Sequence, residues 1–323
     1  MQVVLTEPIE PGGMAVLRQA GLDIVEGPGG EQSPDQLRAL CRGAHAVIVR
    51  QKLPDDLAST CPNLLVAARH GVGVDLIPVE NCTANGVLVT NVPGANADAV
   101  AEFVVAQMLA AARRVETMSR VHLEEGWKPG RAIAGSATEL RGRTLGIVGV
   151  GAIGTRLAEI AHHGFRMQVL GFQRRREALP PFVEYAALPE LFSGSDYIAL
   201  ACPLTPETRG LASAALIRSM KPSAWLMNVS RGAVVEEEAL VAALREGAIG
   251  GAALDVYAVQ PLGAQHPLRK CPNAILSPHV AGLSRESAAK MSQVAAEEVV
   301  RVLRGERPLN LINPEAWEGR RRP

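Results

Sequence analysis

The stretch Gly149-Val150-Gly151-Ala152-Ile153-Gly154 decides the fold of this chain. It follows residues 144–148, an apolar run typical of a buried strand, and leads into residues 155–161, which have the composition of a helix. In that context three glycines allow a tight turn, leave the backbone bare enough for a pyrophosphate, and place a positively polarised helix N-terminus beside it. The stretch therefore predicts dinucleotide binding by Gly149, Gly151, Ala152, Ile153 and Gly154. A glycine-rich turn without function is the alternative.

Short apolar runs alternate with helical patterns on both sides of this motif. Strands are predicted at residues 3–5, 22–25, 46–49, 64–67, 167–172, 197–200, 224–228, 251–254 and 274–276. The helices between them include one uninterrupted helix from Asp98 to about His122, a segment that contains neither Gly nor Pro, and a last one at residues 284–304. Such alternation predicts an α/β fold in which helices cover both faces of parallel sheets. We expect two Rossmann-like, doubly wound domains in series.

Composition limits the partners of the chain. Its 323 residues, 47% of them apolar, are enough for two domains with proper cores. The formal net charge of zero argues against nucleic acid or an anionic membrane as the main partner. The N-terminus lacks the basic start and long apolar run of a signal peptide, so we expect none, and we expect no membrane span because no apolar run is long enough. Five scattered cysteines, none in a Cys-x-x-Cys pair, suggest no metal and fit a reducing cytoplasm. The basic tail, residues 320–323, is expected to be disordered.

Six further blocks occur in a fixed order along the chain. They are His70-Gly71-Val72-Gly73-Val74-Asp75, Asn91-Val92-Pro93-Gly94-Ala95-Asn96 with Val100-Ala101-Glu102, Pro203-Leu204-Thr205-Pro206-Glu207-Thr208-Arg209, Asn228-Val229-Ser230-Arg231-Gly232, Leu254-Asp255-Val256-Tyr257, and Ser277-Pro278-His279-Val280-Ala281-Gly282. With these blocks the chain resembles the D-isomer-specific 2-hydroxyacid dehydrogenases, the family of phosphoglycerate dehydrogenase and glyoxylate/hydroxypyruvate reductase. The resemblance extends over nearly the whole length.

The resemblance implies a domain plan and an activity. A discontinuous substrate-binding domain would comprise residues 1–97 and 283–323, and a dinucleotide-binding domain residues 98–282, with the active site in a cleft between them. The enzyme would transfer a hydride between NAD(P)H and a small 2-keto or 2-hydroxy acid of the glyoxylate or hydroxypyruvate type. Members of the family are usually homodimers, through the long helix and the loop near Gly126 and Trp127.

The resemblance also assigns roles to residues. Arg231 would hold the substrate carboxylate and polarise the carbonyl, which suits a planar, always charged guanidinium. His279 would be the general acid of reduction and the base of oxidation, because imidazole titrates near neutral pH. The remaining candidates are Pro203, Thr208, Val229, Ser230, Asp255 and Gly282 for the cofactor, and Arg50, His70, Gly71, Val72 and Gly73 for the substrate. The backbone N–H groups of the last three would bind the carboxylate.

One residue departs from the family pattern. Gln260 stands where the family has a glutamate that pairs with the histidine. An amide oxygen can still accept a hydrogen bond from the ring and fix its tautomer, but it cannot stabilise the imidazolium with a full charge. We therefore expect His279 to lose its proton at a lower pH than in relatives with glutamate. Three interpretations stay open: a variant of a working dehydrogenase, a formate-dehydrogenase-like hydride transfer without a proton relay, or a catalytically degraded dinucleotide sensor or corepressor-like protein.

The end of the strand at residues 167–172 bears on the choice of cofactor. NAD-preferring proteins commonly carry an acidic residue there, which accepts hydrogen bonds from the adenosine ribose. This chain has Gln173, Arg174, Arg175 and Arg176 instead. No carboxylate repels a 2′-phosphate, and guanidinium groups are good phosphate partners. The sequence therefore predicts a preference for NADP over NAD, with Gln173, Arg174 and Arg175 at the ribose.

Overall fold

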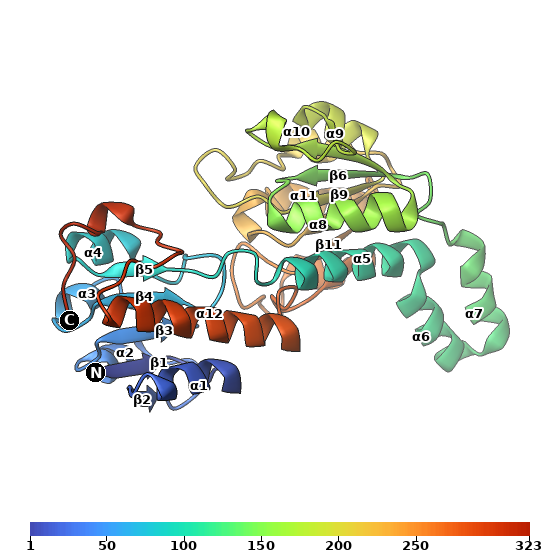
Figure 1. Cartoon of the computed structure of the whole chain (residues 1–323). Helices are drawn as coiled ribbons and strands as arrows, with labels where there is room; N and C mark the ends of the chain where they lie inside the picture. Colours follow the sequence, from blue (N-terminus) through green and yellow to red (C-terminus); the bar gives the residue numbers. More distant parts are fainter. The chain divides into compact units, whose positions relative to one another are not determined.

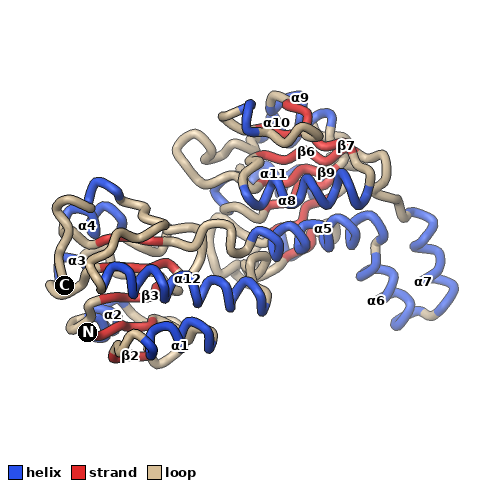
Figure 2. The backbone as a smooth tube through the Cα atoms, in the orientation of Figure 1, coloured by secondary structure: helices blue, strands red, loops and turns tan.

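The computed structural model describes residues 1–323, and the chain divides into two compact units. Unit 1 comprises Met1–Asn96 and Leu283–Pro323, and unit 2 comprises Ala97–Gly282. Each unit is built on one fully parallel sheet with helices on both faces (Figures 1 and 2), so the predicted doubly wound α/β fold is confirmed. No helix combines the length and the apolar character that crossing a membrane requires.

Unit 1 has a five-stranded sheet in the order β2-β1-β3-β4-β5. Its strands are β1 (Gln2–Leu5), β2 (Asp23–Glu26), β3 (Ala46–Val49), β4 (Val66–Arg69) and β5 (Leu88–Thr90), and its helices are α1 (Pro11–Gln19), α2 (Pro34–Cys41), α3 (Leu57–Thr60), α4 (Val79–Ala84) and α12 (Arg285–Leu303). Strand side chains alternate between two cores, as the period of two requires. Val3 and Leu5 pack with α1 and α12, whereas Val4 packs with the cluster that includes α2, α3 and α4.

Unit 2 has a seven-stranded sheet in the order β12-β11-β10-β9-β6-β7-β8. Its strands are β6 (Thr144–Val148), β7 (Gln168–Phe172), β8 (Glu184–Tyr185), β9 (Tyr197–Leu200), β10 (Trp225–Asn228), β11 (Gly251–Leu254) and β12 (Ala274–Leu276), and its helices are α5 (Ala97–Arg113), α6 (Val115–Glu125), α7 (Trp127–Ile133), α8 (Ala152–Glu159), α9 (Leu188–Gly194), α10 (Ala214–Ser219) and α11 (Glu237–Glu246). The strand order reverses between β6 and β9, which is where ligands bind in open parallel sheets.

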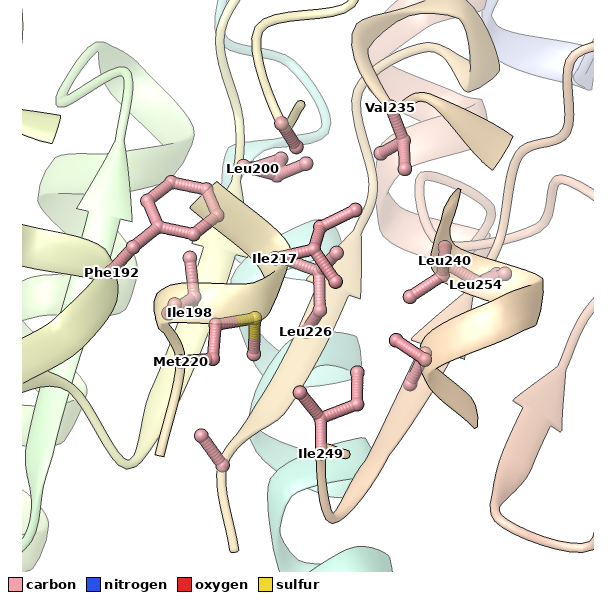
Figure 3. Close-up of a cluster of buried hydrophobic side chains, with 14 of the residues drawn as sticks. Phe192, Ile198, Leu200, Ile217, Met220, Leu226, Val235, Leu240, Ile249 and Leu254 are labelled. Carbon is pink, nitrogen blue, oxygen red and sulfur yellow. The ribbon is translucent and has the colours of Figure 1, made fainter. Parts of the chain in front are cut away.

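A buried hydrophobic cluster holds the second half of this sheet in place (Figure 3). Ile198, Leu200 and Leu226 project from β9 and β10 onto α9, α10 and α11, where Phe192 and Ile217 meet them. These five side chains are essentially inaccessible to solvent. Burying each one contributes about 1.5–3 kcal/mol. The packing makes β9 and β10 a firm base for the loops that follow them.

The long helix predicted from Asp98 to His122 is wrong. Arg114 adopts a left-handed conformation with φ 52°, so the segment forms two helices, α5 and α6. The N–H of Thr138 donates to the carbonyl of Ala112, and the Arg114 guanidinium donates to Ser136 Oγ. These contacts from the chain that follows α7 satisfy the end of α5, and they are invisible in a local pattern. The strands β5 and β8 were also not predicted, because three and two residues are too few to show a periodicity.

The prediction of a disordered tail is also wrong. The Arg321 guanidinium donates to three backbone carbonyls at the end of α3, those of Ala58 (2.9 Å), Cys61 (2.7 Å) and Leu64 (3.1 Å). The N–H of Arg321 donates to Gly86 O, and the Arg320 guanidinium lies 3.4 Å from the centre of the Trp317 ring. Charge alone suggested a solvated tail, but a guanidinium suits the negative end of a helix.

Replacing Arg321 with alanine should therefore destabilise unit 1. Three carbonyls would lose a charged donor, and we expect the free energy of unfolding to fall by about 1–3 kcal/mol. Arg322 is the matched control, because it is the next residue along the chain and its side chain is exposed. Thermal unfolding of both alanine variants tests this. Equal melting temperatures for the two variants would contradict the role of Arg321.

Candidate active site

Three neighbouring strands of unit 2 each lead to one of the predicted catalytic residues. Arg231 follows β10, Gln260 follows β11, and His279 follows β12. These strands are adjacent and parallel. Because the carboxyl ends of parallel strands meet at one edge of the sheet, the fold delivers all three residues to the same edge.

His279 lies in a turn that the carboxylate of Asp255 organises. Asp255 is 1% exposed. It accepts hydrogen bonds from the N–H groups of Val280 (2.9 Å) and Ala281 (2.8 Å) and from Ser277 Oγ (2.6 Å). Its own carbonyl accepts the N–H of His279. These contacts hold His279 at φ 57°, a left-handed conformation that is uncommon for residues other than glycine.

The expected contact between Gln260 and His279 is present. His279 Nδ1 lies 2.9 Å from Gln260 Oε1. A carbonyl oxygen can only accept a hydrogen bond, so this pairing places a hydrogen on Nδ1. Nε2 is then the ring atom that gains or loses a proton. His279 is exposed, and its ring is therefore accessible to a small substrate.

The turn that carries Arg231 is held by a residue that the sequence analysis did not single out. Asn228 is 1% exposed. Its side chain donates to the carbonyl of Arg231 (3.0 Å) and accepts the N–H of Ser230 (3.0 Å). The Arg231 guanidinium in turn donates to the carbonyl of Ser230 (2.7 Å). An asparagine at a strand end, two residues before a serine, is a typical Asx turn, and this was the signal that could have revealed it.

Gly232 joins the Arg231 turn to the loop that bears Gln260. A Cβ at Gly232 would overlap the backbone of Tyr257 and Ala258. Only glycine allows this approach of two backbones. The N–H of Ala258 also donates to Glu237 Oε2 (3.1 Å), at the start of α11. The arginine and the partner of the histidine are therefore mechanically linked.

The glycine motif forms a bare turn at the reversal point of the unit 2 sheet. Gly149 has φ 95°, and a Cβ there would come within 2.6 Å of Cys202 N, just after β9. A Cβ at Gly154 would overlap the Gly149 carbonyl. A Cβ at Gly151, by contrast, would meet nothing within 4 Å. Gly151 begins α8 without any side-chain cap. The first turn of α8 therefore offers its N–H groups to an anion, as a dinucleotide pyrophosphate requires.

The other cofactor candidates are exposed or already bonded. Gln173, Arg174 and Arg175 follow β7, and the Gln173 amide donates to the Arg175 carbonyl (2.8 Å). Arg176 stacks 3.8 Å from the centre of the Tyr185 ring, so that guanidinium has a partner within the protein. Thr208 Oγ1 donates to the Pro203 carbonyl (2.7 Å) and braces that loop. Val229 and Ser230 lie in the Arg231 turn, and Gly282 is the last residue of unit 2.

Gly71, Val72 and Gly73, here termed the glycine loop, follow β4 in unit 1. Their three carbonyl oxygens accept hydrogen bonds from Val92 N (2.9 Å), Asn91 Nδ2 (2.7 Å) and Arg69 Nε (3.0 Å), respectively. All three carbonyls are thus bound by donors of unit 1. Gly71 has φ 149°. The conformation suits a loop that presents its N–H groups to an anion.

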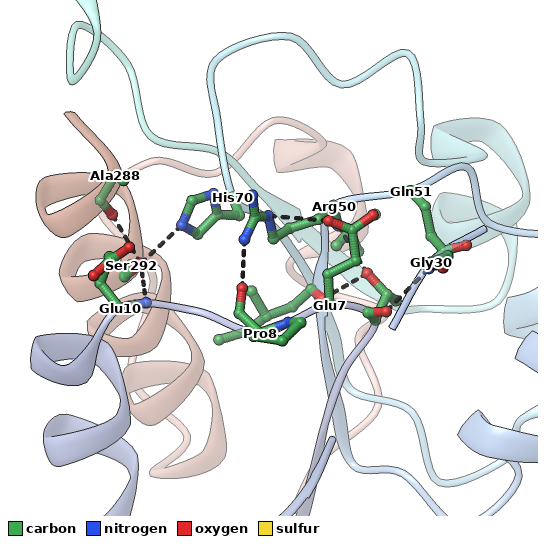
Figure 4. A network of polar contacts seen from close by, with 12 residues as sticks. Glu7, Pro8, Glu10, Gly30, Arg50, Gln51, His70, Ala288 and Ser292 are labelled. Carbon is green, nitrogen blue, oxygen red and sulfur yellow. Dashed lines mark hydrogen bonds and ion pairs between the residues drawn. The ribbon is translucent and has the colours of Figure 1, made fainter. Parts of the chain in front are cut away.

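Two substrate candidates of unit 1 make contacts of another kind (Figure 4). The Arg50 guanidinium donates to the Pro8 carbonyl and lies 3.5 Å from the Glu7 carboxylate. His70 is 5% exposed, and its Nε2 contacts Ser292 Oγ of α12 at 2.8 Å. Burial, followed by the nearby guanidinium groups of Arg50 and Arg69, lowers the pKa of His70 to about 4. Its ring is therefore neutral at physiological pH and has no charge with which to attract a substrate anion.

Comparison with known proteins places these features in one group. A family model described as D-isomer specific 2-hydroxyacid dehydrogenase, NAD binding domain, matches residues 105–281. Glyoxylate reductase of Aeropyrum pernix is 42% identical over 277 residues, which cover 83% of this chain and 82% of the relative. The crystal structure of a Thermus thermophilus protein matches with a TM-score of 0.88 and 34% identity over 97% of this chain and 100% of that chain. The NADPH-dependent glyoxylate/hydroxypyruvate reductase of Sinorhizobium meliloti matches with a TM-score of 0.85 and 27% identity over 98% of each chain.

Proposed function

Because the chain belongs to the D-isomer specific 2-hydroxyacid dehydrogenases and is an NAD(P)-dependent oxidoreductase, we propose that it reduces glyoxylate or hydroxypyruvate with Arg231, Gln260 and His279. One observation carries the assignment of residues. Three adjacent strands deliver these side chains to one edge of the unit 2 sheet, and Gln260 contacts Nδ1 of His279 at 2.9 Å. Relatives named as glyoxylate reductases support the choice of substrate.

In the proposed mechanism, Arg231 supplies a positive charge and His279 supplies a proton. The bound nicotinamide cofactor supplies the hydride. Arg231 binds the carboxylate of the keto acid and stabilises the charge that develops on its carbonyl oxygen. His279 carries the transferable proton on Nε2 and gives it to that oxygen, while Gln260 Oε1 holds the Nδ1 hydrogen. The N–H groups of the glycine loop would contribute further carboxylate binding.

A panel of 2-keto acids tests this function. Each acid is mixed with NADPH or NADH, and the consumption of reduced cofactor is followed at 340 nm. We expect turnover with glyoxylate and hydroxypyruvate. Protein that binds NADPH but reduces no acid in the panel would contradict the proposal and favour a dinucleotide sensor. Turnover of formate with NADP or NAD, and of no keto acid, would favour hydride transfer without a proton relay.

We also propose that NADP is the preferred cofactor. Gln173 is half-buried and Arg174 and Arg175 are exposed after β7, where an acidic residue would favour the unphosphorylated ribose. Two guanidinium groups can pair with a 2′-phosphate. We expect kcat/KM for NADPH to exceed that for NADH by about tenfold or more, since a charge-assisted contact is worth about 1.5–3 kcal/mol. An NADH preference above tenfold would end this proposal. In that case replacing Arg174 and Arg175 with alanine should cause no loss of kcat/KM for NADPH.

Replacing Gln260 with glutamate should move the pH profile of reduction. Reduction needs a protonated His279, so kcat/KM falls as the pH rises past the point where the ring loses its proton. A carboxylate beside Nδ1 favours the imidazolium, and we expect this fall to shift upward by about one to two pH units. Gln168→Glu is the matched control, because Gln168 is exposed at the amino edge of the same sheet. Coincident profiles for Gln260→Glu and the wild type would show that the pairing does not govern the proton.

We further propose that the protein is a homodimer. The helices α6 and α7 extend away from the unit 2 sheet (Figure 1), and Leu123 (81% exposed) and Trp127 (68% exposed) lie on them. Large exposed apolar side chains on a projecting arm support a homodimer, which sedimentation velocity tests directly.

All five cysteines are unpaired and buried, which supports the reducing cytoplasm as the location.

A further inference from the structure

We infer that His70 is a positioning residue: through its contact with Ser292, the ring fixes the glycine loop to α12. The inference rests on the proposed role of this loop in binding the substrate carboxylate. It gives His70 a different task from the direct substrate contact that the sequence suggested. It also assigns a task to Ser292, which lies 222 residues away along the chain.

The ring of His70 is buried at the start of the glycine loop. His70 follows β4 directly and precedes Gly71, and its N–H donates to the Val49 carbonyl of β3 (3.0 Å). Its Nε2 points at Ser292, which is fully buried in the middle of α12 (Figure 4). One side chain therefore connects the carboxyl edge of the sheet to a helix that packs across β3 and β4.

The hydrogen bonds of Ser292 decide which ring nitrogen carries the hydrogen. Ser292 Oγ accepts the N–H of Glu10 (2.9 Å) and donates its single hydrogen to the Ala288 carbonyl (2.8 Å). The hydroxyl then has one acceptor position left, and His70 Nε2 must fill it as a donor. The hydrogen bonds of Ser292 therefore favour the Nε2–H tautomer of His70.

The charges around His70 keep the ring neutral. Burial opposes a positive ring most strongly, and the guanidinium groups of Arg50, which follows β3, and Arg69, the last residue of β4, oppose it as well. The Glu7 carboxylate faces Arg50 at 3.5 Å. With a pKa of about 4, the ring is neutral and carries a single hydrogen across the whole neutral range.

Together with the His70 ring, three further contacts hold the glycine loop in place. Beyond His70, the carbonyls of Gly71, Val72 and Gly73 are each held by a donor of unit 1. A held carbonyl also holds the N–H group of the next residue, because both lie in one peptide plane. Releasing the ring from Ser292 would free the first residue of this set and let the loop shift. A shift of about 1 Å in a binding group can change rates by about 100-fold.

The first measurement reads the tautomer without any substrate. In protein labelled with ¹⁵N in its histidine rings, long-range ¹H–¹⁵N spectra distinguish a protonated from a bare ring nitrogen. We expect His70 to be protonated on Nε2 and bare on Nδ1 at pH 7. A hydrogen on Nδ1, or a charged ring at pH 7, would overturn the inference, whatever the activity of the protein.

The second measurement tests whether the glycine loop keeps its ability to bind a carboxylate. The affinity for oxamate, a non-reducible 2-oxo acid analogue, is measured by calorimetry, together with KM and kcat for the keto acid. His70→Leu removes the donor, and we expect oxamate affinity to fall and KM to rise by about tenfold, while KM for the cofactor stays within threefold. His70→Gln places an amide N–H near the position of Nε2 and should restore affinity to within about threefold. His45→Leu is the control, since His45 precedes β3 at the opposite edge of the sheet.

Ser292→Ala is the complementary variant. It removes the same contact from the other side, so it should match His70→Leu, and the double variant should be no worse than either single one. Additive losses, or a His70→Gln variant as impaired as His70→Leu, would overturn the positioning role. If the wild type turns over keto acids and His70→Leu leaves KM and oxamate affinity unchanged, the inference fails and the proposed function stands. If the wild type neither turns over keto acids nor binds oxamate, both the proposed function and the positioning role fail. The spectrum of the His70 ring would still show whether Ser292 holds it.

Discussion

Replacing Gly232 with alanine is expected to lower kcat/KM for the keto acid by at least about 100-fold. The added Cβ would overlap the backbone of Tyr257 and Ala258, and backbone atoms cannot rotate aside as a flexible side chain can. The Arg231 turn and the loop of Gln260 must therefore move apart. Arg231 would lose its position, and Gln260 Oε1 would lose its place beside His279 Nδ1. Kinetics with the preferred cofactor measure the loss.

Gly263→Ala is the matched control for this variant. Gly263 lies in the same loop, three residues after Gln260, and a Cβ there would meet nothing within 4 Å. We expect its kinetics to match those of the wild type. Thermal unfolding of the Gly232→Ala variant shows whether it remains folded, and NADPH affinity shows whether the dinucleotide turn at Gly149 is intact. A folded variant that binds NADPH and retains wild-type kcat/KM would refute the coupling between the two loops.

The elements that the sequence predicted well are those whose cause is local. Buried parallel strands are short apolar runs, so β3, β9, β11 and β12 have the predicted bounds. The site residues follow strands, and a residue after a parallel strand falls at the carboxyl edge wherever the strand lies in the sheet. This is why Arg231 and His279 could be placed together without knowing the strand order.

The features that could not be predicted depend on contacts between distant segments. Gly232 reads as a turn glycine, and its tight approach to Tyr257 becomes evident only when β10 and β11 lie side by side. The left-handed Arg114 depends on Thr138 and Ser136. Arg321 resembles solvated tail charge until the carbonyls of Ala58 and Leu64 are placed beside it. In each case the pattern is silent because the partner lies far along the chain.

For Asp255 the structure suggests a task other than the one that the resemblance implies. The family pattern offers it as a cofactor contact. In the structure its carboxylate accepts three hydrogen bonds from residues 277–281, which use most of the acceptor positions of a carboxylate. These bonds hold His279 in a left-handed conformation that costs about 1–3 kcal/mol for a residue of this kind. The geometry therefore favours positioning of the histidine over binding of the cofactor.

Replacing Asp255 with asparagine separates the two roles. An asparagine oxygen can accept one of the two N–H groups, but its NH₂ group would face the other, and the turn at Val280 and Ala281 should open. We expect kcat to fall by about 100-fold, with KM for NADPH within about threefold of the wild type. Stopped-flow and steady-state kinetics measure both quantities.

Ser277→Ala is the graded comparison for Asp255→Asn. It removes one hydrogen bond of the same carboxylate but leaves both N–H contacts of the turn in place. The loss in kcat should therefore stay within about fivefold, because the charge-assisted bond that is removed does not itself hold the turn at Val280 and Ala281. A cofactor contact predicts the reverse pattern for Asp255→Asn, with a raised KM for NADPH and an almost unchanged kcat at saturation. That outcome would mean that the left-handed turn of His279 is held by its backbone neighbours alone.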